Sequence, residues 1–250
     1  MAEEEPRLEL RNVSKQFGGL HAVEEVNMRL QAGDRRGILG PNGAGKTTLF
    51  HLITGVLPVS SGEIRLFGQD VTTWPTHRRV ALGMARTFQI TSLFPRLSVL
   101  DNVLLAVQGL RPMKMVMFKP LSRYKDVYGK AEGLLERANF WHLRDQQVRN
   151  LSHGEQRQLE VVLGLASEPK VLLLDEPSAG LATGESREMA RFLNSLDPDL
   201  SILIIEHDLD VLFGVVSHIA VLHYGKLLTE GPSEEVRNDP QVQEIYLGKG

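Results

Sequence analysis

The stretch GPNGAGKTT, residues 40–48, constrains the fold of this chain more than any other. It fits the pattern G-x-x-x-x-G-K-[ST], and it stands between the short apolar run RRGIL and the helical pattern KTTLFHLIT, which stops at Gly55. Glycines let backbone N–H groups converge on phosphate oxygens, because no Cβ blocks their approach. An accidental glycine-rich turn has no need of a strand before it and a helix after it. The stretch therefore predicts a strand–loop–helix unit that binds the phosphates of a nucleotide.

The residues of this loop divide the work of holding phosphate. Lys46 supplies a point charge to the outer phosphates, and the hydroxyl of Thr47 is a ligand for Mg²⁺. The full expected cradle is Gly40, Pro41, Asn42, Gly43, Ala44, Gly45, Lys46, Thr47 and Thr48.

Near-continuous apolar segments alternate with helical patterns over much of the chain. The apolar segments include KVLLLDEP, LSILIIEH and HIAVLH, and the helical patterns include GESREMARFLNSL and DLDVLFGVV. Strands that are buried on both faces indicate a parallel sheet covered by helices, an α/β fold. Near the N-terminus, LELRNVSKQF and EVNMRLQAG alternate apolar and polar residues, which predicts half-exposed antiparallel strands. From about residue 97 to 148 the pattern turns helical and interrupts the α/β order.

Polar side chains follow three of the predicted strands. Asp175 and Glu176 end a buried strand, where ligands of open α/β sheets gather. One carboxylate there can hold Mg²⁺ through water, and the other can act as general base on the attacking water. Taken alone, the pair is better explained as an acidic turn after a strand, but the phosphate loop upstream reverses that preference. His207 ends the next predicted strand. It is either a residue at the rim of the sheet or a contact for the γ-phosphate of a nucleotide. Gln89 ends another, and its amide oxygen can ligate Mg²⁺ or orient water.

The segment RNLSHGEQRQLEVV, residues 149–162, contains a capping box. Ser152 stands three residues before Glu155, so the serine oxygen accepts from a first-turn amide and the glutamate reaches back to the cap amide. The same helix N-terminus gathers free N–H groups and the positive end of the helix dipole, which makes it a candidate anion site. These residues alone leave both interpretations open.

Composition excludes several classes of protein. The chain of 250 residues has a net charge of −3 and no run of Lys or Arg, which argues against a nucleic-acid-binding surface. It has no cysteine, so disulfides and thiolate metal sites are excluded. The start MAEEEP lacks the apolar region of a signal peptide, and no apolar run reaches the roughly 18 residues of a membrane span. The chain is expected to sit against a membrane protein at most.

The order of these motifs resembles the ATP-binding subunits of ABC transporters. An aromatic residue, the phosphate loop, a strand-end glutamine, a helical block, LSHGE, LLLDEP, SAGL and EHD follow one another over nearly the whole chain. The resemblance implies a P-loop NTPase fold. Its RecA-like core with an antiparallel β subdomain would span residues 1–96 and 149–250, and an inserted helical subdomain would span residues 97–148. It also implies that two subunits close head-to-tail around two ATP molecules.

The same resemblance implies roles for the candidate residues. Phe17, which sequence pattern alone leaves as a core aromatic or a stacking platform, looks like the aromatic that stacks on adenine. Asp175 looks like the Mg²⁺-side carboxylate, and Gln89 like a residue that touches Mg²⁺ and senses the membrane partner. Glu176 looks like the catalytic base, and His207 looks like the γ-phosphate switch.

The signature segment departs from the family pattern. The usual LSGGQ is here LSHGE, with His153 and Glu155 in place of glycine and glutamine. By resemblance, Ser152 and Gly154 contact the γ-phosphate that the opposite subunit holds. The aspartate that usually follows AGL is Ala182, which puts one contact that couples the two ATP sites in doubt.

Within the family, FGGLHAVEEV, ARTFQITSLFPRLSVLDNV and the ending QEIYLG look most like ATPases that power uptake of branched-chain amino acids and related molecules such as urea or amides. ATPases of lipopolysaccharide export carry a similar LFPRLSVLDN and are the alternative. The expected cofactors are ATP and Mg²⁺. The expected partners are a second ATP-binding subunit, identical or a close paralogue, transmembrane permease subunits and, through them, a periplasmic or extracellular solute-binding protein. The expected location is the cytoplasmic face of the membrane.

Two other classes of nucleotide-binding protein agree less well with the sequence than a transport ATPase does. Soluble ABC proteins that act on DNA or the ribosome typically carry two cassettes or a long coiled coil, whereas this chain has one cassette and no sustained heptads. A phosphate-loop kinase or GTPase would leave LSHGE and His207 without a role, and no guanine-reading N-K-x-D follows the phosphate loop.

Overall fold

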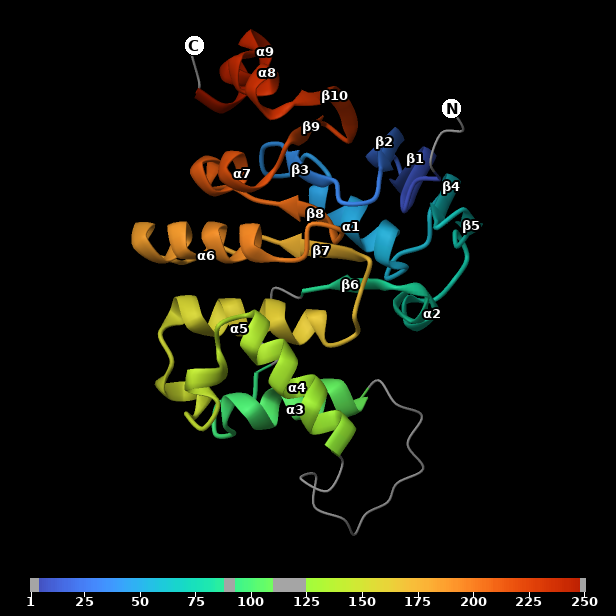
Figure 1. The fold of residues 1–250 in the computed structure, drawn as a ribbon. Coiled ribbons are helices and arrows are strands. Elements are labelled where there is room, and N and C mark those ends of the chain that lie inside the picture. Colours follow the sequence, from blue (N-terminus) through green and yellow to red (C-terminus); the bar gives the residue numbers. More distant parts are fainter. Residues whose placement is uncertain (1–4, 88–92, 110–124, 248–250) are drawn as a thin grey trace.

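A computed structural model describes residues 5–87, 93–109 and 125–247. Two sheets and the helices packed on them make up the molecule (Figure 1). The strands are β1 (Leu8–Phe17), β2 (Leu20–Leu30), β3 (Arg35–Leu39), β4 (Ser61–Leu66), β5 (Gln69–Asp70), β6 (Met84–Arg86), β7 (Val171–Asp175), β8 (Ser201–Ile205), β9 (His218–His223) and β10 (Lys226–Pro232). The helices are α1 (Lys46–Thr54), α2 (Thr76–Leu82), α3 (Val99–Gly109), α4 (Lys125–Arg137), α5 (His153–Leu165), α6 (Thr183–Ser195), α7 (Leu209–Val215), α8 (Ser233–Asn238) and α9 (Pro240–Leu247), with the short 3₁₀ helices η2 (Trp141–Leu143) and η3 (Val148–Asn150).

The larger sheet has the strand order β10-β9-β3-β8-β7-β6 and is parallel except for β10, which pairs antiparallel with β9. The predicted α/β fold with a parallel sheet is thus confirmed. Alternate residues of β7 enter two different cores. Leu172 and Leu174 pack with α3 to α7, whereas Val171 and Leu173 pack with α1 and the smaller sheet. Burial on both faces explains why this strand reads as a continuous apolar run.

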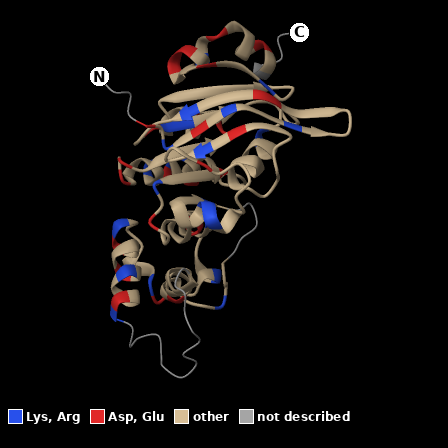
Figure 2. Ribbon diagram, turned by 90° about the vertical axis from the view of Figure 1, so that its right-hand side faces the viewer, with Lys and Arg blue, Asp and Glu red and all other residues tan. Residues whose placement is uncertain are grey.

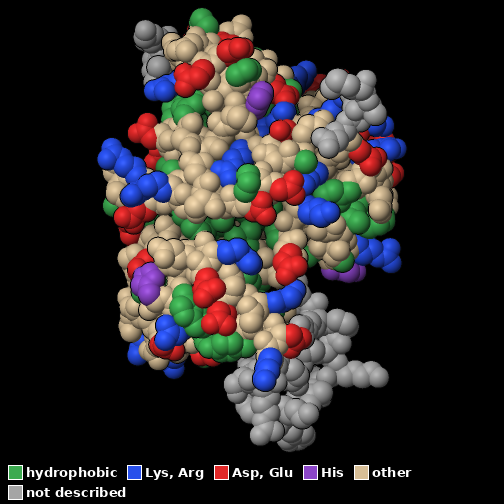
Figure 3. Space-filling view, in the orientation of Figure 1, with side chains coloured by type: hydrophobic (Ala, Val, Ile, Leu, Met, Phe, Trp, Pro, Cys, Tyr) green, Lys and Arg blue, Asp and Glu red, His purple; other side chains and the backbone are tan. Residues whose placement is uncertain are grey.

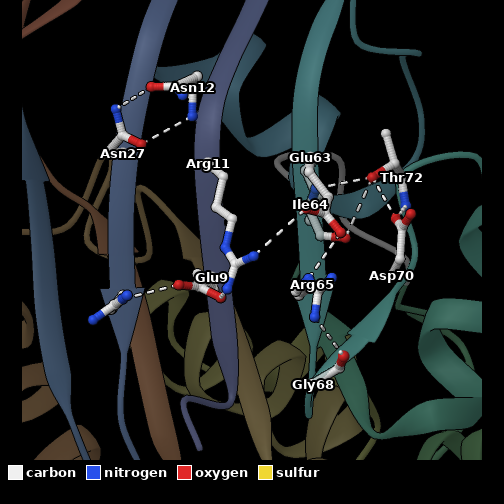
Figure 4. Close-up of polar contacts among 11 residues, drawn as sticks. Glu9, Arg11, Asn12, Asn27, Glu63, Ile64, Arg65, Gly68, Asp70 and Thr72 are labelled. Atoms are coloured by element: carbon white, nitrogen blue, oxygen red, sulfur yellow. Dashed lines mark hydrogen bonds and ion pairs between the residues drawn. The ribbon is translucent and has the colours of Figure 1, made fainter.

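The smaller sheet is antiparallel, with the order β2-β1-β4-β5, as the alternating N-terminal segments predict. Its polar face carries cross-strand ion pairs (Figure 4), and acidic and basic residues lie side by side on these strands in Figure 2. Arg29 of β2 contacts the carboxylate of Glu9 of β1 at 2.9 Å, and Arg11, also of β1, contacts Glu9 at 2.8 Å and Glu63 of β4 at 3.8 Å. Burial raises the pKa of Glu9, but the hydrogen bonds from Arg11 and Arg29 outweigh it, so the pKa lies below its ordinary value.

Helix α1 follows the phosphate loop and ends where Gly55 was predicted to stop it, because Gly55 adopts the left-handed conformation of a C-cap. The buried guanidinium of Arg79, from α2, closes the same end. It donates to the carbonyl oxygens of Leu52 at 2.8 Å and Ile53 at 2.7 Å. Burial lowers the pKa of Arg79 to about 10, so the side chain stays charged at neutral pH.

The helical block lies below the sheets in Figure 1 and contains α3 and α4. Its two ends are hydrogen-bonded to each other. The Val148 amide donates to the Leu97 carbonyl at 3.1 Å, and the Val99 amide donates to the Gln146 carbonyl at 2.9 Å. The chain therefore enters the helical block and leaves it at neighbouring points. Most of the loosely patterned stretch between α3 and α4 lies outside the described residues.

The C-terminal helix α9 starts as predicted. Asp239 caps it by accepting from the amide of Gln241 at 2.8 Å, and Pro240 is the first helical residue. Within residues 5–87, 93–109 and 125–247, no helix combines the length and the apolar character that a membrane crossing requires. Acidic and basic side chains are interspersed on the face shown in Figure 3.

Candidate nucleotide-binding site

The loop between β3 and α1 needs glycine at two positions. Gly45, the N-cap of α1, has φ 103°, and a Cβ there would lie 2.3 Å from the carbonyl oxygen of Ala22. Gly43 has φ 81°, and a Cβ added to it would meet no atom within 4 Å. Both residues adopt the left-handed region, which favours glycine. The loop thus has the glycine backbone conformations and, at Gly43, the open space that a phosphate cradle requires.

Lys46 begins α1 and folds back onto this loop. Its Nζ donates to the carbonyl oxygens of Gly40 at 2.5 Å and Pro41 at 3.1 Å, and the residue is only 6% exposed. Burial lowers the pKa of Lys46, and the charges of Glu176 and Asp175 offset part of that effect. Phosphate oxygens are stronger acceptors for an ammonium group than neutral carbonyls. The buried cation is therefore positioned to exchange these bonds for phosphate contacts.

A pocket of about 440 Å³ opens in front of the loop and brings most of the candidate residues together. Leu20, His21, Ala22 and Tyr224 also line it, although the sequence did not single them out. The lining is Phe17, Leu20, His21, Ala22, Asn42, Gly43, Ala44, Gly45, Lys46, Thr47, Thr48, Glu176, His207 and Tyr224. Tyr224 comes from the turn between β9 and β10 and is 80% exposed. In the sequence it follows a strand as an ordinary turn residue, so no pattern marks it.

Phe17 lies in the wall of this pocket, at the end of β1. The side chain is 46% exposed, which excludes the core-aromatic alternative. The ammonium of Lys15 lies 5.2 Å from its ring centroid. An exposed ring beside a phosphate cradle is available for stacking on a planar base.

Glu176 and His207 meet at the carboxyl ends of β7 and β8. Their side chains are 2.8 Å apart, measured from Glu176 Oε1 to His207 Nε2. Glu176 has φ 50°, an unusual backbone conformation for a residue with a side chain, and its amide donates to Ile205 O at 2.8 Å. The geometry therefore pairs the two side chains that were expected to act on the terminal phosphate and the attacking water.

Glu206 accepts hydrogen bonds from the segment after β7 and from the segment after β8. It was not identified as a site residue from the sequence. The residue is 2% exposed. One oxygen accepts from the amide of Ser178 at 3.1 Å, and the other accepts from the amide of His207 at 2.7 Å and that of Asp208 at 3.2 Å. The available signal was a carboxylate at the end of the buried strand in IIEHD, next to the histidine. Its position fixes the backbone on either side of the Glu176–His207 pair.

Asp175 precedes Glu176 at the end of β7 and is not among the residues that line the pocket, and its carboxylate is fully buried. One oxygen is 2.6 Å from Arg86 of β6, and the other, Oδ1, is buried with no hydrogen-bond partner among the described residues. A buried unsatisfied carboxylate oxygen is costly unless a donor reaches it. A water bound to Mg²⁺ is such a donor, so Asp175, with the exposed hydroxyl of Thr47, fits a magnesium site of this kind.

Two of the expected parts of the site are not among the lining residues of this pocket. Gln89 falls outside the described residues. Ser152 to Glu155 do not line the pocket but begin α5, where the predicted capping box is present. The Ser152 amide donates to Glu155 Oε2 at 2.7 Å, and the Glu155 amide donates to Ser152 Oγ at 3.1 Å.

A larger cavity, of about 580 Å³, lies beside Pro169 and Leu200, which precede β7 and β8. It is therefore at the amino ends of these strands, whereas Glu176 and His207 lie at their carboxyl ends. Arg7 in its wall donates to the carbonyl oxygen of Lys170 at 3.0 Å and to Asp199 Oδ2 at 2.8 Å. Its guanidinium is thus already committed to protein acceptors, and the groups suited to phosphate chemistry are concentrated in the smaller pocket.

Family models match two parts of the chain. The model described as ABC transporter matches residues 23–179, which include the phosphate loop and the LLLDEP strand. A model described as branched-chain amino acid ATP-binding cassette transporter matches residues 226–250.

Two named relatives are similar over nearly their whole length. The probable branched-chain amino acid transport ATP-binding protein LivG of Archaeoglobus fulgidus is 36% identical, over 96% of this chain and 95% of that protein. The high-affinity branched-chain amino acid transport ATP-binding protein LivG of Escherichia coli K12 is 34% identical, over 98% of this chain and 99% of that protein.

Solved structures show the same fold. A nucleotide-free ATP-binding cassette from an ABC transporter superposes with a TM-score of 0.84 at 30% identity, over 98% of this chain and 100% of the other. The ADP conformation of MJ1267, an ATP-binding cassette of an ABC transporter, gives a TM-score of 0.87 at 31% identity over the same shares.

The phosphate cradle, the carboxylates at the strand ends and these likenesses define one class of protein: the chain belongs to the ABC transporter family, as an ATP-binding subunit with the ABC ATPase fold. It is a transport-coupled ATPase. Subunits of this family bind nucleotide and work as dimers with transmembrane permease components.

Proposed function

We propose that this chain powers the import of branched-chain amino acids or related small polar molecules. The observation that carries the proposal is the match of residues 226–250 to the branched-chain amino acid cassette model, beyond the general ABC match at residues 23–179. The names of the two LivG relatives point the same way. Neither of them is named for lipopolysaccharide export, the alternative that the sequence left open.

The site supports a specific division of labour. Phe17 stacks on the adenine, while the amides of residues 40–48 and Lys46 hold the phosphates. The Thr47 hydroxyl, Asp175 and Gln89 would hold Mg²⁺. Mg²⁺ supplies charge neutralisation to the phosphates, and the protein supplies position.

Glu176 acts as the general base on the attacking water. His207, which contacts Glu176 in the separate subunit, turns to the γ-phosphate when ATP is bound. Ser152, His153, Gly154 and Glu155 face the ATP of a second subunit. Their position outside the chain's own pocket supports this assignment, since they need another molecule's phosphate to act on.

The assembly follows from these roles. Two copies, or this chain and a paralogue, close around two ATP molecules on the cytoplasmic face of the membrane, beside permease subunits served by a solute-binding protein. Residues 97–148 form the helical subdomain, and residues 1–96 and 149–250 form the core with its antiparallel β subdomain. The hydrogen bonds between the two ends of the helical block support this division.

Glu176→Gln is expected to keep ATP binding, to abolish hydrolysis and to accumulate an ATP-dependent dimer, because the amide cannot take a proton from water. ATP hydrolysis, nucleotide binding and light scattering measure the three properties. Lys46→Ala serves as the contrast, because it is expected to weaken ATP binding itself. Normal turnover by Glu176→Gln would show that another group is the base.

The transported class is tested with the complex that co-purifies with this chain from detergent-solubilised membranes. After reconstitution in proteoliposomes, ATP-dependent uptake of labelled leucine is expected, and it should be lost with Glu176→Gln. ATP-dependent movement of lipopolysaccharide without leucine uptake would instead assign the chain to export.

A further inference from the structure

Three amides at the start of α5, those of Ser152, Gly154 and Glu155, already have acceptors in the separate subunit. Those of Ser152 and Glu155 are satisfied inside the capping box. The amide of Gly154 donates outside its own helix, to Glu185 Oε1 of α6 at 3.0 Å. Two of the amides at this helix end, those of Ser152 and Gly154, thus donate to carboxylates of the chain itself, at a place where free amides would favour an anion.

Glu185 is held at both of its oxygens. While Oε1 accepts from Gly154, Oε2 accepts from the amide of Ala182 at 3.1 Å. These two backbone hydrogen bonds, the one from Gly154 first, lower the pKa of Glu185 below its ordinary value. Ala182 has no side-chain acceptor with which to cap α6, so Glu185 supplies one. A single ionised carboxylate thus bridges the N-termini of two helices.

Position 154 must be small for this contact to form. A Cβ on Gly154 would lie 3.1 Å from Glu185 Cβ, 3.2 Å from Cγ and 3.2 Å from Oε1. Helices α5 and α6 are therefore packed so that the Glu185 carboxylate reaches the Gly154 amide directly. Ser152, unlike the Gly154 amide, still has a hydrogen to donate. Its Oγ only accepts in the capping box, so the hydroxyl hydrogen remains able to donate.

We propose that Glu185 is an internal competitor for the γ-phosphate of the partner subunit's ATP. It occupies the Gly154 amide in the separate subunit and gives it up when the two subunits close; this rests on the proposed function, in which Gly154 faces that phosphate. The exchange replaces one charge-assisted hydrogen bond by another, so the carboxylate raises the ATP concentration needed for closure without preventing it. Its bond to Ala182 keeps the released oxygen nearby, ready to return when the subunits part.

The test uses the Glu176→Gln chain, which is expected to dimerise with ATP without turning it over. Glu185→Ala is added to it, and the ATP concentration for half-maximal dimerisation is measured by size-exclusion chromatography with light scattering. Removal of the competitor is expected to lower that concentration by about tenfold, the effect of one net hydrogen bond. Glu188→Ala is the matched control, since Glu188 lies on the same helix with a side chain that is 63% exposed. It should leave the concentration unchanged.

Hydrogen exchange at Gly154 gives a second readout that does not depend on activity. Without ATP, the Gly154 amide should exchange slowly in the Glu176→Gln chain and faster after Glu185→Ala. With saturating ATP, both proteins should protect it. If the alanine variant is not recovered folded, Glu185→Gln carries the same test, because it replaces one of the two accepting oxygens by a donating NH₂ group and removes the negative charge.

The outcomes separate this inference from the function on which it rests. Dimerisation of the Glu176→Gln chain that is unchanged or weakened by Glu185→Ala would overturn the competitor role alone. Absence of any ATP-dependent dimer of Glu176→Gln would overturn the proposed function, and the competitor role with it.

Discussion

Glu155 replaces the glutamine of the usual signature, and its carboxylate is used locally. Oε2 accepts from the Ser152 amide at 2.7 Å, inside the same helical turn. A carboxylate that closes a capping box is drawn back toward its own helix rather than toward an incoming phosphate. The substitution from the family pattern is thus compatible with an active subunit.

Glu155→Gln is expected to leave ATP hydrolysis unchanged or raised, because glutamine keeps the accepting oxygen and removes a negative charge from the helix end. Glu155→Ala should lower the free energy of unfolding by about 1 kcal/mol, the usual effect of losing a cap. Urea unfolding and steady-state hydrolysis of both variants measure this. A large loss of hydrolysis in the glutamine variant would show that the charge itself is required.

Whether a site residue could be predicted from the sequence depends on how far away its partner lies along the chain. The phosphate loop and the capping box are local patterns, and the sequence predicts them from spacing alone. The contacts of Arg86 with Asp175 and of Glu185 with Gly154 join residues 89 and 31 positions apart, so only tertiary packing creates them. No local pattern distinguishes Arg86 or Glu185 from an ordinary charged residue.

Helices and strands were predictable where a local stop or cap fixes them. Gly55 ends α1, and Asp239 with Pro240 starts α9, as the sequence indicates. The buried strands β7 and β8 follow from apolar runs. The order of strands in the sheets did not follow, because the antiparallel pairing of β1 with β4 depends on which surfaces meet in the folded chain.

Arg79 joins secondary-structure elements in a way that the sequence does not predict. In THRRVALG it is one of two adjacent arginines on a short helix, yet it is 1% exposed and bonds four carbonyl oxygens, those of Leu52, Ile53, Thr72 and Trp74. It fastens the end of α1 to α2 and to the segment before α2.

Arg79→Met is expected to reduce the free energy of unfolding by roughly 2–4 kcal/mol, because buried carbonyls lose a charged donor. Arg78→Met is the matched control: Arg78 is exposed, so the substitution should change the free energy of unfolding by less than about 0.5 kcal/mol. Urea denaturation of both variants decides the matter. Equal stability of the two would mean that water or a rearranged loop satisfies the carbonyls.

At the scale of the whole molecule, acid should destabilise the chain through carboxylates with lowered pKa values. Glu9 and Glu185 both have folded pKa values below their ordinary value of 4.5. A lowered carboxyl pKa adds stability that is fully present above the ordinary pKa and lost as pH falls through the folded value. The melting temperature is therefore expected to hold from pH 7 to about 5 and to fall below roughly pH 4.5.

Glu9→Gln should make that acid dependence less steep, because it removes one of the contributing carboxylates. Glu188→Gln, at an exposed position, is the control and should leave the slope as it is. An identical slope for all three proteins would assign the acid sensitivity to other groups.

The clamp that Arg79 forms on α1 has an electrostatic consequence for the nucleotide pocket. The aligned peptide dipoles of the helix leave negative potential at its last carbonyls and positive potential at its first amides, beside Lys46. Arg79 cancels the negative end with a buried cation. The pocket at the other end, roughly 14 Å away for a helix of this length, is left with a positive field that nothing within the helix offsets. Arg79 therefore contributes to the electrostatic attraction between the pocket and a polyphosphate, although it does not contact that polyphosphate.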